Sequence, residues 1–515
     1  MTLEEIASLG KGIACDSRQV QPGDIFVAIP CANIDKHIQQ AVDQGASIVV
    51  TETNAANRWK NIKTISTLNP RLMLAKLAKV FYSSQPQNTV AVTGTNGKSS
   101  VVHLTRQLWE GCEHPAASLG TLGLISQQPT IPNGFRDMGS KIRGEHWSVA
   151  NYMKRGASAI FEGQISKDEG YNLQLPSLTT LDPISLHKTL NHLSKQHIKY
   201  FAFEASSHGL DQYRLHAVEL KAAGFTNLTQ DHLDYHQTME DYFLAKSKLF
   251  TEVLPQGATA VLNKDSIFFE RLQTLCHQRS QTILTYSLTQ RADLTVQSIS
   301  QHTNFLEFDL SIKDQIYSQQ KVNLVGRFQL ENLLCGLGLA IATGAPIDSL
   351  IKTLPSLSAV KGRMQLVGNF KGAYVFIDYA HTPDALKTTL MNLRPHTQRK
   401  LWVVFGCGGN RDALKRPQMG AIACEYADQV IVTDDNPRYE EPALIREQIL
   451  AACLKAIEIS DRRQAIRSTI AQLKEGDIVL IAGKGHETGQ IVGDTTYPFD
   501  DQIEVETFLK ECINV

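Results

Sequence analysis

The stretch NTVAVTGTNGKSSVVHLTRQLWE, residues 88–110, decides the fold of the central part of this chain. It opens with a short run rich in β-branched residues, which predicts a buried strand. The glycine-rich turn TGTNGKSS, residues 93–100, follows at once, and the remainder has the pattern of a helix. A strand, a glycine-rich turn and a helix in this order predict a phosphate-binding site, with a chance turn before a helix as the alternative.

The residue types in this turn suit the binding of an anion. Glycines allow successive N–H groups to point at one phosphate, and the following helix adds its positive N-terminal end. Lys98 can reach terminal phosphates and the Ser99 hydroxyl can bind Mg²⁺, although Val92 stands where the full G-x-x-x-x-G-K-[ST] pattern has its first glycine. The predicted nucleotide-binding residues of the turn are Gly94, Thr95, Asn96, Gly97, Lys98, Ser99 and Ser100.

Strands and helices alternate on both sides of this unit, which predicts an α/β fold with mostly parallel sheets. The expected domains are residues 1–87, residues 88–355 with a polar insertion near 126–173, and residues 356–515. In the last domain, buried-type strands are each followed by a polar or glycine-rich segment. These segments are DYAH, GCGGNRD, DDNPR and GKGHE. Ligands bind beyond the carboxyl ends of such strands, so these segments predict half of a binding cleft.

Composition excludes several classes of function. The chain has 515 residues with a net charge of -1, from 51 basic and 52 acidic side chains, which favours neither nucleic acid nor a membrane surface as partner. No apolar run is long enough to span a bilayer, and the N-terminus MTLEEIASLG lacks the apolar core of a signal peptide. The 9 cysteines form no C-x-x-C pair, which favours reduced thiols and a cytoplasmic location.

Three further residues are candidates for a metal centre near the phosphates. Glu204 lies in FEASSHGL directly after a predicted strand, His232 lies in NLTQDHLDYH, and Lys246 lies in the helical stretch DYFLAKSKLF. Carboxylate and imidazole are acceptable ligands for a divalent cation, whereas an ammonium repels one. A desolvated lysine can lose its proton and react with carbon dioxide to give an anionic carbamate, with a surface lysine as the alternative.

Taken together, these segments resemble the Mur ligase family of cell-wall peptide synthesis. TGTNGKSS, EASSHGL, NLTQDHLDYH, GRFQLENLL, DYAHTPDAL, GCGGNRD, DNPR and GKGHE follow the family's order from about residue 90 to 490. The resemblance implies a nucleotide-sugar domain, a central P-loop-like ATPase domain and a C-terminal Rossmann-like domain. It implies an ATP-dependent ligase that forms ADP and phosphate, through an acyl phosphate, in peptidoglycan precursor synthesis.

The resemblance also assigns roles to residues. Lys98, Glu204, His232 and Lys246 would be catalytic, with Lys246 carbamylated. Ser99, Glu204, His232 and Lys246 would hold magnesium, and Asn332 and Asp378 would contact ATP. The implied substrate-binding residues are Cys15, Ser17, Thr179, Thr180, Ser206, Gln212, Arg214, Arg411, Asp435, Asn436, Pro437, Arg438, Gly483 and Glu487. The implied substrates are a UDP-N-acetylmuramoyl dipeptide, meso-diaminopimelate and ATP, bound by a monomer.

The segment Asp435-Asn436-Pro437-Arg438 looks like the diaminopimelate-selective form of the family. Arg438 can hold a distal carboxylate through two parallel hydrogen bonds, and an arginine left unpaired would disfavour lysine. Three alternatives remain open: a lysine-adding form, a folylpolyglutamate synthetase-like ligase, and a nucleotide-binding regulatory or scaffold protein that has lost catalysis.

Overall fold

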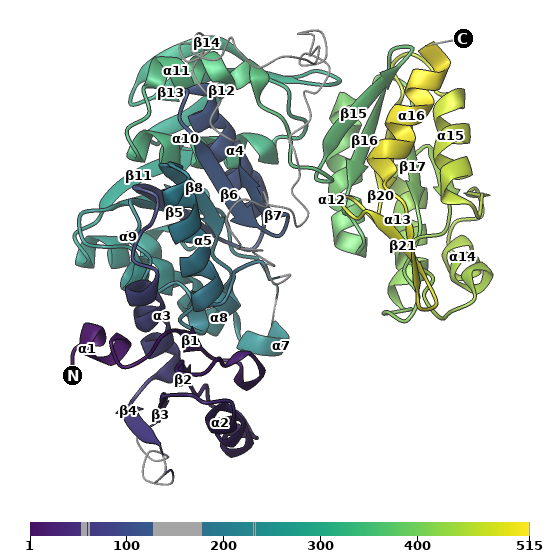
Figure 1. The fold of residues 1–515 in the computed structure, drawn as a ribbon. Coiled ribbons are helices and arrows are strands. Elements are labelled where there is room, and N and C mark those ends of the chain that lie inside the picture. The colour runs from purple at the N-terminus through teal and green to yellow at the C-terminus, as the bar shows by residue number, and fades with distance from the viewer. Residues whose placement is uncertain (53–58, 60–61, 127–177, 230, 232, 514–515) are drawn as a thin grey trace, which may run out of the picture. The chain divides into compact units, whose positions relative to one another are not determined.

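The computed structural model describes residues 1–52, 59, 62–126, 178–229, 231 and 233–513 (Figure 1). The chain divides into two compact units, Met1–Thr285 with Cys335–Leu350, and Tyr286–Leu334 with Ile351–Val515. The boundaries predicted after residues 87 and 355 stay a prediction. The predicted insertion near 126–173 lies, apart from Ser126, outside the described residues.

The first unit begins with a four-stranded parallel sheet of order β1-β2-β3-β4. Its elements are α1 (Leu3–Ala7), β1 (Ile13–Ala14), β2 (Ile25–Val27), α2 (Ile34–Asp43), β3 (Ile48–Glu52), β4 (Lys63–Thr67) and α3 (Pro70–Phe81). Successive residues of β2 face opposite sides, so Ile25 and Val27 pack with α3 while Phe26 packs with α2. Alternating strands and helices give this part of the chain the predicted α/β character.

The second sheet of this unit carries the glycine-rich turn at its centre. In the first unit its order is β11-β10-β9-β5-β8-β6-β7. The elements are β5 (Asn88–Thr93), α4 (Lys98–Gly111), β6 (Ala116–Gly120), β7 (Gly123–Ser126), α5 (Pro183–Lys195), β8 (Tyr200–Glu204), α6 (Ser207–Asp211), β9 (Ala222–Phe225), α7 (Leu233–His236), α8 (Met239–Lys248), β10 (Thr259–Asn263), α9 (Phe269–Gln278) and β11 (Thr282–Ser287). Figure 1 shows α4 beside β6 and β8.

Strand β5 pairs in parallel with β8 on one side and β9 on the other. The register aligns Val92 with Glu204 and Thr93 with Phe225, so all three strands end at the same level. The turn after β5 therefore lies between the residues that follow β8 and β9. The prediction of a mostly parallel sheet is confirmed, with β7 as an antiparallel edge strand.

The second unit contains an antiparallel run and a six-stranded sheet of order β15-β16-β20-β17-β18-β19. The first part comprises β12 (Leu294–Gln301), β13 (Leu306–Ile312) and β14 (Gln315–Val322). Helices α10 (Phe328–Ala342) and α11 (Ile347–Thr353) have residues in both units. The six-stranded sheet and its helices are β15 (Gln365–Phe370), β16 (Ala373–Asp378), α12 (Pro383–Leu393), β17 (Leu401–Phe405), α13 (Lys415–Tyr426), β18 (Gln429–Val432), α14 (Pro442–Leu450), β19 (Ile457–Glu458), α15 (Arg462–Gln472), β20 (Ile478–Ala482), the hairpin β21 (Gly489–Val492) and β22 (Thr495–Pro498), and α16 (Asp501–Ile513).

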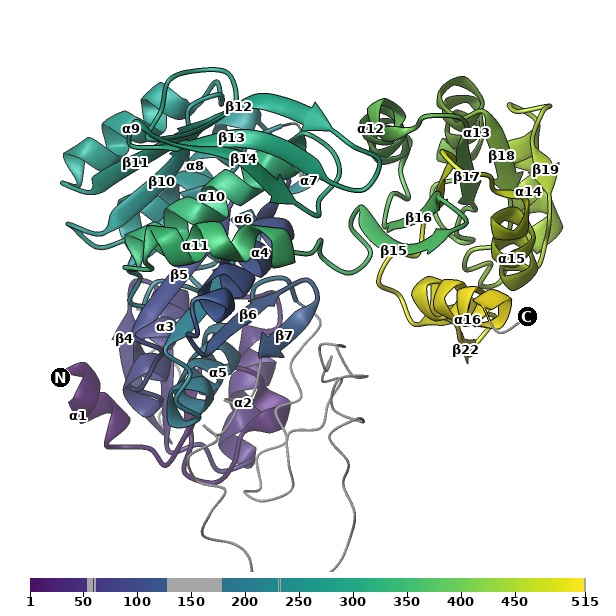
Figure 2. The same ribbon diagram turned by 90° about the horizontal axis from the view of Figure 1, so that it is seen from above.

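Helices cover both faces of this six-stranded sheet, as predicted for a doubly wound domain. Along β20, Ile478 and Leu480 join the core under α12, α13 and α14, while Val479 and Ile481 join the core under α15 and α16. Figure 2 shows α12 and α16 on opposite sides of β16. Burial on both faces explains why these strands are continuously apolar rather than alternating.

In the part of the chain that the structure describes, no helix combines the length and the apolar character needed to cross a membrane.

Candidate active site

The glycine-rich turn is held by the residues that follow β9. Thr95 N–H donates to the Asn227 carbonyl (2.8 Å), and Asn96 N–H donates to the Asn227 side-chain oxygen (2.9 Å). A Cβ on Gly94 would lie 1.9 Å from the Thr226 hydroxyl oxygen, so only glycine fits this close approach. Thr226 and Asn227 are absent from the predicted site. Their polar side chains directly follow a buried strand, and this position could have indicated them from the sequence.

Helix α4 begins directly where the turn ends. Its N-cap, Gly97, has a φ of +86°, a left-handed conformation that glycine adopts without strain. Lys98 Nζ donates to the carbonyls of Gly94 (2.9 Å) and Thr95 (2.8 Å), so the ammonium lies over the turn. Residues 94–100 thus form one continuous structure in which a helix N-terminus and a lysine attract an anion.

Glu204 ends β8, and its buried carboxylate lies beside the first turn of α4. The Ser99 hydroxyl donates to Glu204 Oε1 (2.8 Å), and Thr121 N–H donates to the same oxygen (2.9 Å). A Cβ on Gly120 would lie 2.0 Å from that oxygen, so the glycine closing β6 makes room for the carboxylate. Ser99, Gly120 and Glu204 line one pocket. A hydroxyl and a carboxylate are hard oxygen donors of the kind Mg²⁺ prefers.

Lys246, in α8, is 1% exposed and lies against the other side of the turn. Its Nζ donates to the Gly94 carbonyl (2.8 Å) and lies 4.5 Å from the centre of the Tyr242 ring. Burial lowers the pKa of Lys246 well below its usual value, Lys98 lowers it further, and Asp231 opposes the shift. The neutral amine favoured by these surroundings is the form that reacts with carbon dioxide, so the residue fits the predicted carbamate.

The predicted metal ligand His232 lies outside the described residues. Within the described ranges, no group of three or more His, Cys, Asp and Glu side chains is gathered in a way that could hold a metal ion. Of the predicted magnesium ligands, Ser99, Glu204 and Lys246 are described, and the first two form the oxygen pair.

Four of the residues predicted to hold the muramoyl-peptide substrate lie together beyond β8. Ser206 N–H donates to the Thr180 hydroxyl (2.9 Å), and Arg214 donates to the Thr180 carbonyl (2.7 Å) and to the Gln212 side-chain oxygen (2.7 Å). Burial lowers the pKa of Arg214. Thr179 precedes this cluster and is half-buried. The Thr180 hydroxyl donates to the Glu204 carbonyl (2.9 Å), so the cluster adjoins the end of β8, and binding of an anionic substrate by Arg214 stays a prediction.

The predicted uridine-binding residues lie near the start of the N-terminal sheet. Ser17 is buried, and its hydroxyl donates to Gln40 Oε1 (2.9 Å) and contacts His37 Nδ1 (3.2 Å). Burial raises the pKa of the Cys15 thiol to about 12, so this cysteine is protonated at neutral pH. Binding of uridine at these residues stays a prediction.

The two predicted nucleotide contacts of the second unit are buried and hydrogen-bonded within the chain. Asn332 donates to the Gln329 side-chain oxygen (3.1 Å). The two Asp378 oxygens accept from the N–H groups of Met364 (2.7 Å) and Ala380 (2.8 Å), and burial raises the pKa of this carboxyl. Asp378 therefore shapes the loop at the end of β16, and direct contact with a nucleotide stays a prediction.

The residues predicted to bind the amino acid lie at the carboxyl ends of β17, β18 and β20. Arg438 has a φ of +53°, its N–H donates to the Ile491 carbonyl (3.0 Å), and its guanidinium donates to the Gly409 carbonyl (3.0 Å). Gly483 has a φ of +112°. A Cβ there would lie 2.8 Å from the Asp435 carboxylate, so glycine is needed. Among the other predicted residues of this set, Arg411 is exposed, whereas Asn436 and Pro437 are buried.

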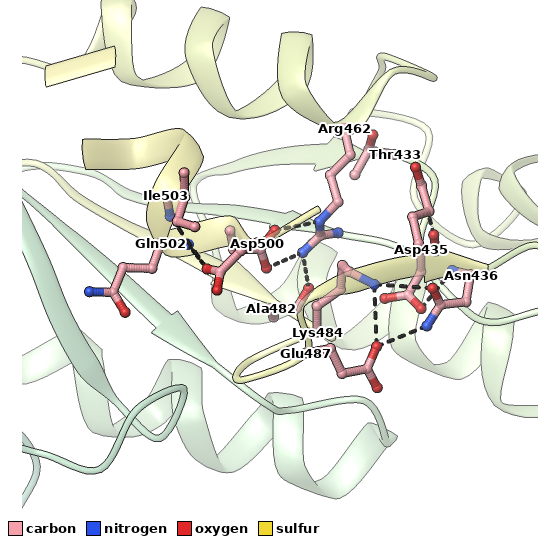
Figure 3. A network of polar contacts seen from close by, with 12 residues as sticks. Thr433, Asp435, Asn436, Arg462, Ala482, Lys484, Glu487, Asp500, Gln502 and Ile503 are labelled. Atoms are coloured by element: carbon pink, nitrogen blue, oxygen red, sulfur yellow. Dashed lines mark hydrogen bonds and ion pairs between the residues drawn. The ribbon is translucent and has the colours of Figure 1, made fainter. Parts of the chain in front are cut away.

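Lys484, which is absent from the predicted site, joins two of the predicted residues. Its side chain is fully buried, and Nζ donates to Asn436 Oδ1 (3.0 Å) and Glu487 Oε2 (3.2 Å). Asn436 Nδ2 donates to the same Glu487 oxygen (2.9 Å), which closes a triangle of hydrogen bonds (Figure 3). The sequence shows Lys484 only as the lysine of GKGHE. The structure is needed to show that its side chain is buried rather than solvated.

Comparisons with known proteins agree with this arrangement. The chain is 41% identical to the UDP-N-acetylmuramoyl-L-alanyl-D-glutamate--2,6-diaminopimelate ligase of Bradyrhizobium diazoefficiens, over 97% of this chain and 94% of that protein. It is 38% identical to the Rickettsia rickettsii protein of the same name, over 98% of this chain and 96% of that protein. A solved structure of such a ligase is 31% identical, with a TM-score of 0.71 over 98% of this chain and 96% of that one.

More distant structures share the fold alone. The MurF ligase of Thermotoga maritima in complex with ADP is 17% identical, with a TM-score of 0.56 over 98% of this chain and 99% of that one. Family models match residues 148–340 as the Mur ligase middle domain and residues 362–485 as the Mur ligase glutamate ligase domain. The glycine-rich turn and its buried carboxylate agree with these near full-length matches. The chain therefore belongs to the Mur ligase family.

Proposed function

We propose that this chain joins meso-diaminopimelate to the D-glutamate carboxylate of UDP-N-acetylmuramoyl-L-alanyl-D-glutamate, with ATP as the energy source. The observation that carries the proposal is the grouping of Lys98, the Ser99–Glu204 oxygen pair and buried Lys246 around one phosphate-binding turn. The name shared by relatives at about two-fifths identity supports the choice of substrates.

The reaction proceeds in two steps. In the first, a carboxylate oxygen of the substrate bonds to the terminal phosphorus of ATP and ADP leaves, which gives an acyl phosphate. In the second, the amine attacks the acyl carbon, inorganic phosphate leaves, and the ammonium proton is released to a base. The first step is needed because a free carboxylate has no adequate leaving group.

The residues of the turn favour the first step electrostatically. Backbone N–H groups and the Lys98 ammonium stabilise negative charge on the transferred phosphoryl oxygens. Ser99 and Glu204 would hold Mg²⁺, which supplies further neutralisation of that charge. Lys246, as a carbamate, would add an anionic oxygen ligand on the other side of the turn.

Selectivity for diaminopimelate rests on the loop after β18. Arg438 is held by the hairpin β21–β22 through its backbone and by Gly409 through its guanidinium, so its position is fixed before a ligand arrives. A fixed guanidinium pairs with the distal carboxylate of diaminopimelate, and lysine would leave that charge unpaired. Asp435 carries the complementary negative charge for an ammonium. The reaction belongs in the cytoplasm, where ATP is available, and we expect a monomer.

The test is a panel of amino acids with purified protein, ATP, Mg²⁺ and the UDP-linked dipeptide. Phosphate release and a product mass increased by one diaminopimelate residue are expected only with that amino acid. Release with lysine alone would assign the chain to the lysine-adding form. ATP binding without phosphate release under every condition would instead indicate a protein that has lost catalysis.

A further inference from the structure

Lys484 is a fully buried cation whose hydrogen-bond donors are all used. Besides Asn436 Oδ1 (3.0 Å) and Glu487 Oε2 (3.2 Å), its Nζ donates to the Gly489 carbonyl (2.6 Å). An ammonium has three N–H donors, so these acceptors satisfy it completely. Its carboxylate partner, Glu487, keeps 34% of its side chain exposed and so lies at the edge of the predicted amino-acid site.

The other buried cation beneath this site is also neutralised. Arg462 donates to both oxygens of Asp501 (2.7 and 2.8 Å), and both side chains are fully buried. Asp435 differs from Glu487 and Asp501, because among the described residues it has no ion-pair partner. Its Oδ1 accepts the Asn436 N–H (2.7 Å). Lys484 neutralises Glu487 and Arg462 neutralises Asp501. Asp435 is therefore the carboxylate of the three that keeps an unbalanced negative charge.

From this charge balance we infer that Lys484 is a specificity-determining residue that neutralises Glu487 and so favours a net-neutral diamino diacid over a singly cationic diamino monoacid. The inference rests on the proposed function and concerns the same site. With Lys484 present, Asp435 supplies the negative group for the distal ammonium of diaminopimelate, and Arg438 supplies the positive group for its distal carboxylate, with the exposed Arg411 as a further cation. Without the lysine charge, Glu487 adds a second negative group. The kcat/KM for a cation such as L-lysine then rises relative to the kcat/KM for diaminopimelate.

The test compares kcat/KM for meso-diaminopimelate with kcat/KM for L-lysine in the wild type and in Lys484→Met. This substitution keeps an unbranched side chain of nearly the same length, one heavy atom shorter, and removes the charge. We expect the diaminopimelate-to-lysine ratio to fall by at least about tenfold, the size of effect seen for close charge pairs at binding sites. The double variant Lys484→Met/Glu487→Gln restores the charge balance, and its ratio should return toward the wild-type value.

Arg399→Met provides a matched control in the same sheet. Arg399 pairs with the fully buried Asp477 (3.0 Å) ahead of β20, at the end of the sheet opposite to the amino-acid site. Its loss removes a cation from a buried carboxylate as well, so stability falls while the substrate ratio stays constant. Lys484→Gln, which keeps a hydrogen-bond donor, gives the same test if Lys484→Met does not fold.

An unchanged ratio in folded Lys484 variants would overturn the inference, since a purely structural lysine alters both substrates equally. A ratio that falls in the single variant and stays low in the double variant would also contradict it, because charge would not be the cause. A wild type inactive with diaminopimelate would refute the proposed function instead, so the two failures are distinguishable.

Discussion

Replacing Gly120 with alanine should disable the site without unfolding the protein. The added Cβ would lie 2.0 Å from Glu204 Oε1 and 2.5 Å from Glu204 Cδ. Non-bonded contacts of a Cβ essentially never fall below 3.0 Å, so the carboxylate must retreat by 3.0 minus 2.0, or about 1 Å. The Ser99 hydroxyl and the Thr121 N–H, which now hold the carboxylate, would lose their acceptor.

Two magnitudes follow from that displacement. Overpacking of a tight interior costs about 1–3 kcal/mol of unfolding free energy, which a folded enzyme can tolerate. Misplacement of a reacting or ligating group by about 1 Å costs on the order of 100-fold in rate. We therefore expect kcat to fall about 100-fold, and the Mg²⁺ concentration required for half-maximal activity to rise.

The assay is phosphate release across a Mg²⁺ titration, together with urea unfolding of the same preparation. Gly257→Ala is the control: Gly257 has a φ of +77°, and nothing lies within 4 Å of the added Cβ. That substitution should cost about 1–2 kcal/mol through backbone strain and leave kcat unchanged. Wild-type kcat and Mg²⁺ dependence in Gly120→Ala would show that Glu204 does not act through its position.

Three further predictions concern single side chains. The lowered pKa of Lys246 means that the unfolded chain binds a proton that the folded chain lacks. In CO₂-free buffer, the free energy of unfolding should therefore rise with pH between the pKa of Lys246 in the folded chain and the usual lysine pKa. The rise should be at most about 1.4 kcal/mol per pH unit. Lys246→Met should lose this rise in urea unfolding, and an equally steep rise in the variant would exclude Lys246 as its source. Arg438→Ala should raise the KM for diaminopimelate about 10- to 100-fold, from the loss of a charged hydrogen bond, while steady-state kinetics give an unaltered KM for ATP. Asp501→Asn leaves Arg462 buried with its charge unbalanced, so chemical denaturation should report a loss of about 3–5 kcal/mol, and a loss below about 1 kcal/mol would contradict the buried ion pair.

The strand, glycine-rich turn and helix of residues 88–110 could be predicted from the local sequence, although Asn227, a distant residue, holds the turn in place. Residues 94–100 follow one another along the chain, and glycine conformations, a helix start and a lysine are all encoded within that stretch. The apolar runs of β16, β17, β18 and β20 predict buried strands for the same reason, since burial on both faces requires apolar side chains throughout. Neither His232 nor most of the predicted insertion near 126–173 falls within the described residues, so both stay predictions.

The contacts that give the site its chemistry depend on the tertiary structure. Lys246 reaches the Gly94 carbonyl across 152 positions of sequence, and Glu204 reaches Ser99 across 105. Both contacts exist because β5 pairs with β8 and β9, and no local pattern specifies which strands become neighbours. The sequence alone therefore determined the elements and the residue types at their ends. Tertiary packing determined that Lys246 loses its solvent, that Gly120 must lack a side chain, and that Lys484 is buried against Asn436 across 48 positions of sequence. Desolvation and steric exclusion arise only when distant segments are packed together.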